Sequence, residues 1–210
     1  MELGIAYLWT GDYYSAHIHL SNAIQMFPFS MSGFYGADGI AKWCMGECAA
    51  AVDDWRTGMN AQYTDAAGLG VRLPLLLFVA SILHPEVFPR KKAEQILAQK
   101  TEDARAGHWP GTLAKFVLGR ESAEGATEPR SVMKESDKKH REWLIRFYGH
   151  LLHFGSGNLT STQLAELMRT ATDTSQAPFS DQDSFLSLMW SGEFFIARHQ
   201  TRVPKTVNGL

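Results

Sequence analysis

Residues 2–28 read ELGIAYLWTGDYYSAHIHLSNAIQMFP, and residues 38–59 read DGIAKWCMGECAAAVDDWRTGM. The two stretches align with one constant shift, which carries Gly4 onto Gly39. The aligned pairs are Gly4 with Gly39, Ala6 with Ala41, Gly11 with Gly46, Ala16 with Ala51, Leu20 with Trp55, and Ala23 with Gly58. Self-similarity at one fixed spacing indicates a repeated structural unit.

Each copy predicts two antiparallel helices joined by a tight turn. Gly4 and Ala16 are small, so the two helices can approach closely, and Leu20 supplies bulk to the seam. Gly11 falls at the turn, where a residue without a β-carbon can take a left-handed conformation. Pro28 ends the second helix because proline has no amide hydrogen and restricts the residue before it.

The first copy resembles the tetratricopeptide repeat (TPR) family in the order and spacing of its residues. The matching residues are Leu3, Gly4, Tyr7, Gly11, Ala16, Leu20, Ala23 and Pro28. The second copy departs from the motif at Lys42, which stands where the first copy has Tyr7. The resemblance implies an all-α fold, a TPR-like α-α superhelix in which antiparallel helix pairs stack with a right-handed twist, with degenerate helix pairs toward the C-terminus.

Beyond the two motifs of residues 1–60, segment 61–119 predicts degenerate helices of the same stack. Residues 73–83 (LPLLLFVASIL) predict a buried helix, too short to span a membrane. Residues 89–99 predict a short amphipathic helix with proline near its start, and residues 108–119 predict another that ends at a glycine. Segment 120–138 is charged and poor in large apolar residues, so we expect an exposed loop.

Segment 139–199 predicts a C-terminal helix pair and a capping helix. The pair consists of residues 142–155 and 161–172, with Thr160 or Ser161 as the N-cap of its second member. Residues 181–200 predict the last amphipathic helix, and we expect residues 201–210 to be poorly ordered. We therefore expect residues 1–210 to form a single helical domain.

Two further stretches, WPGTLAKFVLG (residues 109–119) and RFYGHLLHFG (residues 146–155), are similar to segments of bacterial TPR proteins of the lipoprotein-scaffold type. In that subgroup, two repeats lead to a shorter helical pair and a further aromatic helix pair. The resemblance implies protein binding without a catalytic centre.

Composition is ordinary for a globular chain, with 45% hydrophobic and 20% charged residues among 210. The formal net charge of −2 gives no positive field for nucleic acid, so we expect no nucleic-acid partner. Cys44 and Cys48 are too few for a disulfide framework, and we interpret them as reduced thiols. The start MELGIAYLW lacks a secretion leader, so we expect a cytoplasmic protein without a membrane span, although a removed lipoprotein signal is the alternative.

Catalytic and metal chemistry find little support in the sequence. Phosphate-binding glycine loops and the G-x-S-x-G nucleophile motif are both absent. His150 and His153 share a helix face, and Glu142 is the carboxylate that could join them on a metal, but an H-E-x-x-H pattern is missing. We therefore expect a protein that is not an enzyme, with no catalytic residue, metal or cofactor.

The concave face of a TPR stack is lined by the first helix of each pair. In this register the partner-binding candidates are Ile5, Leu8 and Trp9 of the first pair, and Ile40, Lys42 and Trp43 of the second, with Cys44 beside them. Aromatic side chains are favoured anchors at interfaces. The alternatives are that either indole belongs to the core and that Lys42 is simply solvated.

The sequence therefore predicts a non-catalytic adaptor or scaffold that binds a partner protein or peptide through its concave face. A second hypothesis is a bacterial immunity protein or antitoxin, which would bind a cognate toxin and cover its active site. The oligomeric state and the identity of the partner are left open by the sequence.

Overall fold

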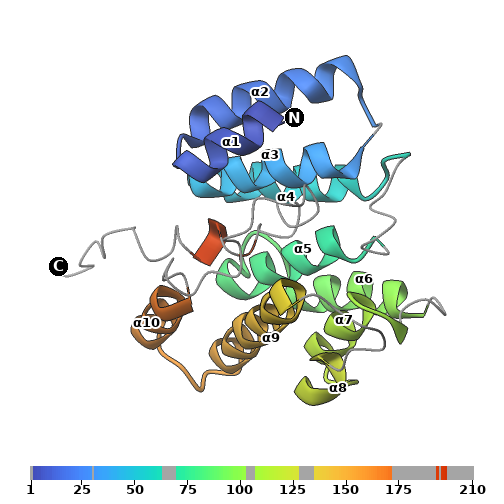
Figure 1. Ribbon diagram of the computed structural model, residues 1–210, viewed down its shortest axis with the longest axis vertical. Coiled ribbons are helices and arrows are strands. Elements are labelled where there is room, and N and C mark those ends of the chain that lie inside the picture. Colours follow the sequence, from blue (N-terminus) through green and yellow to red (C-terminus); the bar gives the residue numbers. More distant parts are fainter. Residues whose placement is uncertain are drawn as a thin grey trace.

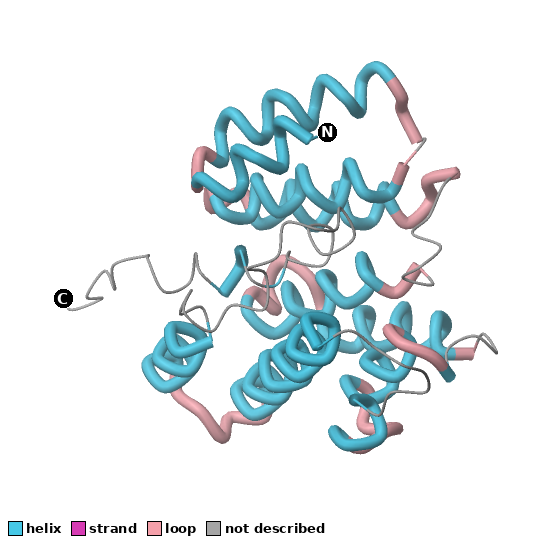
Figure 2. The backbone as a smooth tube through the Cα atoms, viewed as in Figure 1, coloured by secondary structure: helices cyan, strands magenta, loops and turns pink. Residues whose placement is uncertain are grey.

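The computed structural model describes residues 2–29, 31–62, 70–102, 107–127, 135–171, 193 and 195–197. Throughout these ranges the ordered elements are helices, and no β-strand occurs among them (Figures 1 and 2). The all-α prediction is therefore confirmed for the described part of the chain. In the same ranges, no helix is both long enough and apolar enough to cross a membrane.

Two helical hairpins form the N-terminal half. The first consists of α1 (Glu2–Thr10) and α2 (Tyr13–Met26), and the second of α3 (Ser32–Cys44) and α4 (Cys48–Gly58). Figure 1 shows α1 and α2 at one end of the molecule, with α3 and α4 between them and the remaining helices. Each helix contacts the next one along the chain.

In both hairpins the two helices approach closely at the same pair of repeat positions. A β-carbon added to Gly4 would lie 2.7 Å from Leu20 Cγ, and one added to Gly39 would lie 2.7 Å from Trp55 Cδ1. Both distances are too short for real atoms, so each glycine is needed for the helices to approach. The small-against-large pairing predicted from the repeat is therefore present in both copies.

The turns of both hairpins also match the sequence expectation. Gly11 and Gly46 have positive φ angles of 84° and 86°. In each case the residue after the glycine donates its amide hydrogen to a carbonyl five residues back, Asp12 to Tyr7 and Glu47 to Lys42. This pattern is the Schellman motif, which satisfies the carbonyls left free at a helix end.

The C-terminal half begins with α5 (Arg72–Leu83) and α6 (Arg90–Thr101) and continues with α7 (Gly111–Val117) and α8 (Ala123–Thr127). Its longest helix, α9 (Glu135–Gly155), contacts α5, α7 and α8, and α10 (Ser161–Ala171) packs on α9. Helix α5 is buried along nearly its full length, because α4, α6 and α9 all contact it.

Thr160, one of the two alternatives predicted for the N-cap of α10, is the residue that caps it. Its hydroxyl accepts from the Gln163 amide (3.2 Å), and Gln163 Oε1 accepts from the Thr160 amide (2.8 Å). These reciprocal bonds form a capping box. The sequence leaves Thr160 and Ser161 open, and the structure resolves them through the glutamine three residues after Thr160.

The prediction of an exposed loop over residues 120–138 is wrong for part of that segment. Helix α8 lies inside it, with Ala126 buried and the Ala126 carbonyl accepting from Thr112 Oγ1 (3.2 Å), and α9 begins within it at Glu135. A charged segment can form helix where one small residue per turn is buried and the charges stay solvated. Most of the expected helix over 181–200, and the tail 201–210, lie outside the described residues.

Candidate interaction face

The six residues predicted to line a partner groove do not form one open surface. Ile5, Leu8, Ile40 and Trp43 are buried, with Trp43 only 1% exposed, so they contribute to the core and present almost nothing to a partner. Trp43 stacks on Trp55 at a centroid distance of 5.6 Å. The groove assignment is therefore wrong for these four side chains in this structure, because other parts of the chain cover them.

Trp9 is half-buried, and the C-terminal part of the chain covers it. The edge of one ring meets the face of the other where Trp9 contacts Phe195, at a centroid distance of 4.9 Å. The thiol of Cys44, beside the predicted groove, donates to the Phe195 carbonyl (3.8 Å). A stripe of apolar residues on the first helix of a hairpin looks the same in sequence whether it faces solvent or another segment of its own chain.

Lys42 also has internal partners. Its Nζ donates to Asp54 Oδ2 (2.7 Å) and lies 3.1 Å from Asp38 Oδ2. Asp38 is 1% exposed, and it also binds His17 Nδ1 (2.8 Å) and the Ser21 hydroxyl (3.3 Å). We call these five residues the α2–α4 polar cluster; they tie α2 to α3 and α3 to α4.

The arrangement of side chains in this cluster fits a structural role and not a catalytic one. Both the Ser21 hydroxyl and an Asp38 carboxylate oxygen lie on Nδ1 of His17. A catalytic triad instead places the nucleophile and the carboxylate on opposite ring nitrogens. The cluster therefore fixes α2 against α3 and does not provide an activated serine.

Burial raises the pKa of Asp54 to about 6. The ion pair with Lys42 opposes this shift, and the nearby negative charge of Asp38 adds to it. One lysine thus neutralises two carboxylates only in part, so Asp54 takes up a proton more readily than an ordinary aspartate. Within the described residues, no group of three or more His, Cys, Asp or Glu side chains is arranged to hold a metal ion.

The exposed apolar surface lies elsewhere, on the first hairpin and the connection that follows it. All large hydrophobic side chains that are exposed in the described ranges lie between residues 3 and 31. We call this set the N-terminal apolar face: Leu3, Tyr14, Ile18, Met26, Phe27, Phe29 and Met31. Large apolar side chains left exposed on one hairpin and its connection are a feature of interaction sites in soluble proteins.

Helix α2 has two apolar sides, which explains the face. Ala16 and Leu20 are fully buried against the rest of the bundle, whereas Tyr14 and Ile18 are 67% and 41% exposed. Tyr14 and Ile18 are four residues apart, so they share one side of the helix. The polar cluster anchors the same helix through His17 and Ser21, so the exposed side is held on a fixed support.

Phe29 occupies a backbone conformation that is unfavourable for a large side chain. Its φ angle is +58°, in the left-handed region. Three contacts hold it there: its amide donates to the Tyr35 hydroxyl (3.2 Å), its carbonyl accepts from the Gln62 amide (2.7 Å), and its ring stacks on Tyr35. The ring nevertheless stays 56% exposed. Strain kept at an exposed aromatic is a feature of functional sites.

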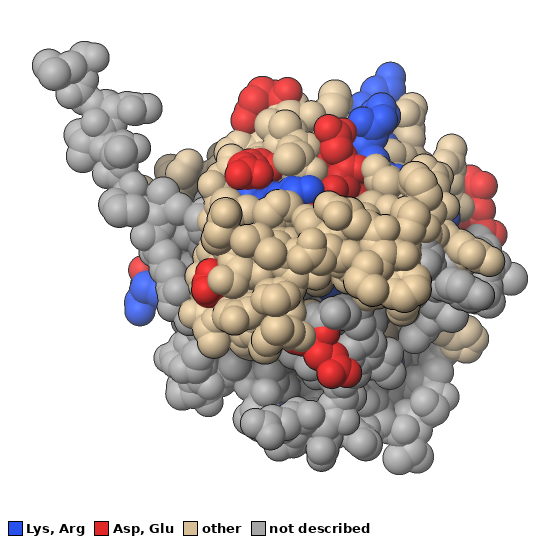
Figure 3. Space-filling view, turned by 90° about the horizontal axis from the view of Figure 1, so that it is seen from above, with Lys and Arg blue, Asp and Glu red and all other residues tan. Residues whose placement is uncertain are grey.

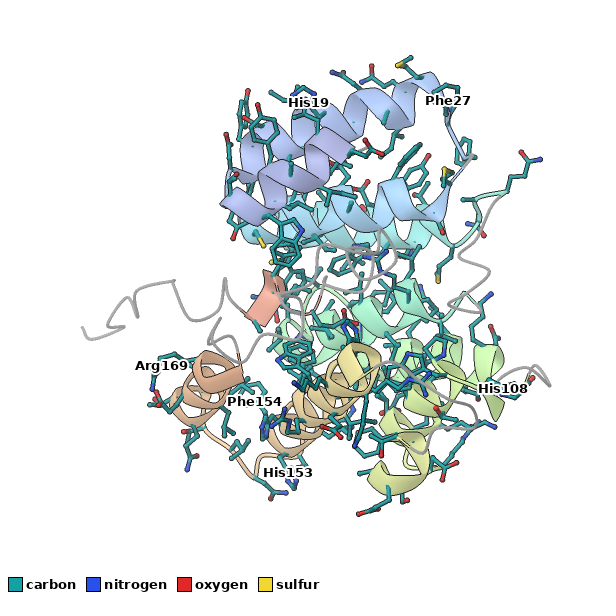
Figure 4. The ribbon with its side chains drawn as sticks, in the orientation of Figure 1. His19, Phe27, His108, His153, Phe154 and Arg169 are labelled. Atoms are coloured by element: carbon teal, nitrogen blue, oxygen red, sulfur yellow. The ribbon has the colours of Figure 1, made fainter. Side chains whose placement is uncertain are left out.

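Figure 3 looks down onto the end of the molecule that carries α2, and most of the described surface there is uncharged. The first hairpin contains no Lys or Arg, because the first such residue of the chain is Lys42. Its exposed charges are the carboxylates of Glu2 and Asp12. Figure 4 shows Phe27 at the C-terminal end of α2 and His19 along the same outer helix.

Sequence reasoning missed this face, although two signals for it were present. Tyr14 and Ile18 add a second apolar stripe to a helix whose buried stripe is complete without them. The connection between the hairpins, MFPFSM over residues 26–31, carries four large apolar side chains where a turn is expected to be polar.

No family model, curated protein or solved structure matches this chain.

Proposed function

We propose that this protein is a non-catalytic interaction module that binds a partner protein through the N-terminal apolar face. The observation that carries the proposal is the confinement of exposed large apolar side chains, within the described residues, to the first hairpin and its following connection. Burial of such side chains against a partner is the main source of binding free energy at interfaces. The proposal keeps the scaffold role inferred from the sequence and moves the binding surface from the concave side to the outer side of α1 and α2.

The chemistry of the face indicates what kind of partner fits. Its anchors are aromatic and aliphatic, and the exposed charged side chains among the described residues of the first hairpin are the carboxylates of Glu2 and Asp12. A partner helix or strand with apolar side chains flanked by Lys or Arg therefore complements it in both respects, because complementary charge favours the correct orientation.

We further propose that the two hairpins are TPR-type repeats in a right-handed stack. Support comes from the equivalent contacts of Gly4 with Leu20 and of Gly39 with Trp55, at one constant shift along the chain. In such a stack the outer side of the first hairpin is a surface on which a further helix can pack. Cytoplasmic residence is part of the same proposal, and the reduced state of Cys44 and Cys48 supports it.

The test replaces Tyr14→Ser and Ile18→Ser together, and in a second variant Phe27→Ser and Phe29→Ser. Each full-length variant is compared with the wild type for quantitative co-purification of bound proteins from the native host. We expect both variants to lose the same specific partner. Because Tyr14 and Ile18 are exposed, we expect the first variant to unfold within about 0.5 kcal/mol of the wild type.

A matched control is Gln99→Ser, an exposed position on α6 far from the face in sequence. It should retain the partner. Retention of the partner by both face variants would refute the proposal. Light scattering of the purified wild type covers the remaining possibility, since a dimer that both variants dissociate would assign the face to self-association instead.

A further inference from the structure

A second surface feature lies in the C-terminal half, and it does not depend on the proposed partner face. A cleft of about 570 Å³ opens between α6, the end of α7 and one residue of α9. Volumes of this order are typical of small-molecule sites. In Figure 1, α6 and α7 lie toward the opposite end of the molecule from α2.

One wall of the cleft is apolar. Phe116, Val117 and Leu118 come from the end of α7, and Leu152 comes from α9. Gly119 turns the chain there with a φ angle of +68°, and the amide of Arg120 donates to the Lys115 carbonyl (2.8 Å). This helix-ending turn brings Arg120 to the rim directly after the apolar wall.

The cationic residues of the cleft are Arg90 and Lys91 at the N-terminal end of α6 and Arg120, which is bonded to Thr101 at the C-terminal end of the same helix. The charge of Arg90 is already matched, because its Nε donates to Glu94 Oε1 (2.9 Å). Arg90 also donates to the Gly155 carbonyl (3.1 Å), which fastens it to the last turn of α9, where Figure 4 labels His153 and Phe154. Arg90 is therefore a fixed part of the wall.

Lys91 and Arg120 have no carboxylate partner among the described residues. Arg120 Nη1 donates to the neutral hydroxyl of Thr101 (3.1 Å), which positions the guanidinium without cancelling its charge. Glu94 is the single acidic residue among the described lining residues, and it is paired with Arg90. The cleft thus holds two uncompensated positive charges beside an apolar wall, on a chain whose net charge is −2.

We propose that this cleft binds an amphipathic organic anion, with one carboxylate or phosphate group on an apolar body. The anionic group binds Arg120, Lys91 adds positive charge farther along α6, and the body packs on Phe116, Leu118 and Leu152. Guanidinium groups suit carboxylate and phosphate oxygens because their donors are planar and paired. Sugars and bases fit poorly, since Gln95 is the only uncharged polar side chain among the described residues of the lining, and their hydroxyl and amino groups would lose hydrogen bonds to water.

Calorimetric titration of the full chain tests the proposal, with octyl phosphate as the probe. Octylamine, octanol and inorganic phosphate are matched comparisons that invert the charge, remove it, or remove the apolar body. We expect octyl phosphate to bind more tightly than each of them. Vesicles of phosphatidylglycerol form a parallel arm, which distinguishes a lipid source of the ligand from a free one.

Arg120→Glu should weaken octyl phosphate binding by about tenfold, as expected when an attractive ion pair becomes a repulsive one. Lys91→Glu acts from farther along α6 and should weaken binding by about threefold. Lys92→Glu is the control, because it makes the same charge change at the next residue of α6, outside the cleft. Equal binding of octylamine or octanol, equal binding of inorganic phosphate, or equal weakening by Lys92→Glu would each overturn the proposal. The variants change exposed side chains, so unchanged melting temperatures confirm that the loss is one of binding.

Discussion

The first and second hairpins use the same internal contact but differ in their surroundings. In α1–α2, Gly4 meets Leu20, and in α3–α4, Gly39 meets Trp55. Helix α3 is buried almost throughout, because α2 and α4 both cover it, whereas α2 keeps Tyr14 and Ile18 exposed. Hairpin packing and outer surface are therefore separate properties of the repeat: the first is shared by both copies, and the second is specific to each.

The largest expected effect is a difference in destabilisation between equivalent positions of the two hairpins. Trp55→Ala should lower the free energy of unfolding by about 3–5 kcal/mol, because a fully buried indole is lost together with its hydrogen bond to the Gly36 carbonyl (3.2 Å). Leu20→Ala should cost less, about 2–3 kcal/mol, since a smaller side chain leaves a smaller cavity. Urea denaturation measures both. A larger loss from Leu20→Ala would contradict the expectation that removal of the larger side chain leaves the larger cavity.

The next effect concerns the polar cluster that joins the hairpins. Asp38→Asn should lower the unfolding free energy by about 2–3 kcal/mol, because His17 and Lys42 lose a buried charged acceptor. Asp53→Asn makes the same change at a side chain that is 73% exposed, and it should cost less than about 0.5 kcal/mol. Equal costs for the two variants would show that the cluster does not hold α2 on α3.

The smallest expected effect is a pH dependence from Asp54. Its pKa is about 6 in the folded protein, above its ordinary value of 3.8, so the folded state takes up this proton first as the pH falls. This carboxyl therefore adds stability as the pH falls from about 6 to about 4, by roughly 1 kcal/mol after allowance for solvent screening.

Asp54→Asn removes that contribution. The difference in unfolding free energy between the wild type and Asp54→Asn, measured by urea denaturation across this pH range, should shift in favour of the wild type on acidification. A constant difference would show that the pKa of Asp54 is ordinary.

The sequence allows the hairpins to be predicted in detail because their determinants are local. Glycine at 11 and 46 sets the turns, and small residues at 4 and 39 set the approach of the helices. The buried helix over residues 73–83 is also predictable from the sequence, since a continuous apolar run is buried in any helical bundle.

The surface was not predictable in the same way. Trp43 and Ile40 were expected in a groove, yet they are core, because α3 is covered on all sides by elements that its own sequence does not reveal. Tyr14 and Ile18 are apolar residues that the rest of the described chain leaves exposed. Which apolar side of a helix is covered depends on contacts between segments far apart in the chain.

Site-specific crosslinking tests the central claim most directly. A photoreactive phenylalanine analogue is placed at Tyr14, at Phe27 or at Gln99 of the full chain in the native host, and the products are identified by mass spectrometry. We expect Tyr14 and Phe27 to give the same discrete product with a second, different protein, and Gln99 to give none. The same product from Gln99, or no product from either face position, would contradict a partner-binding role for the N-terminal apolar face.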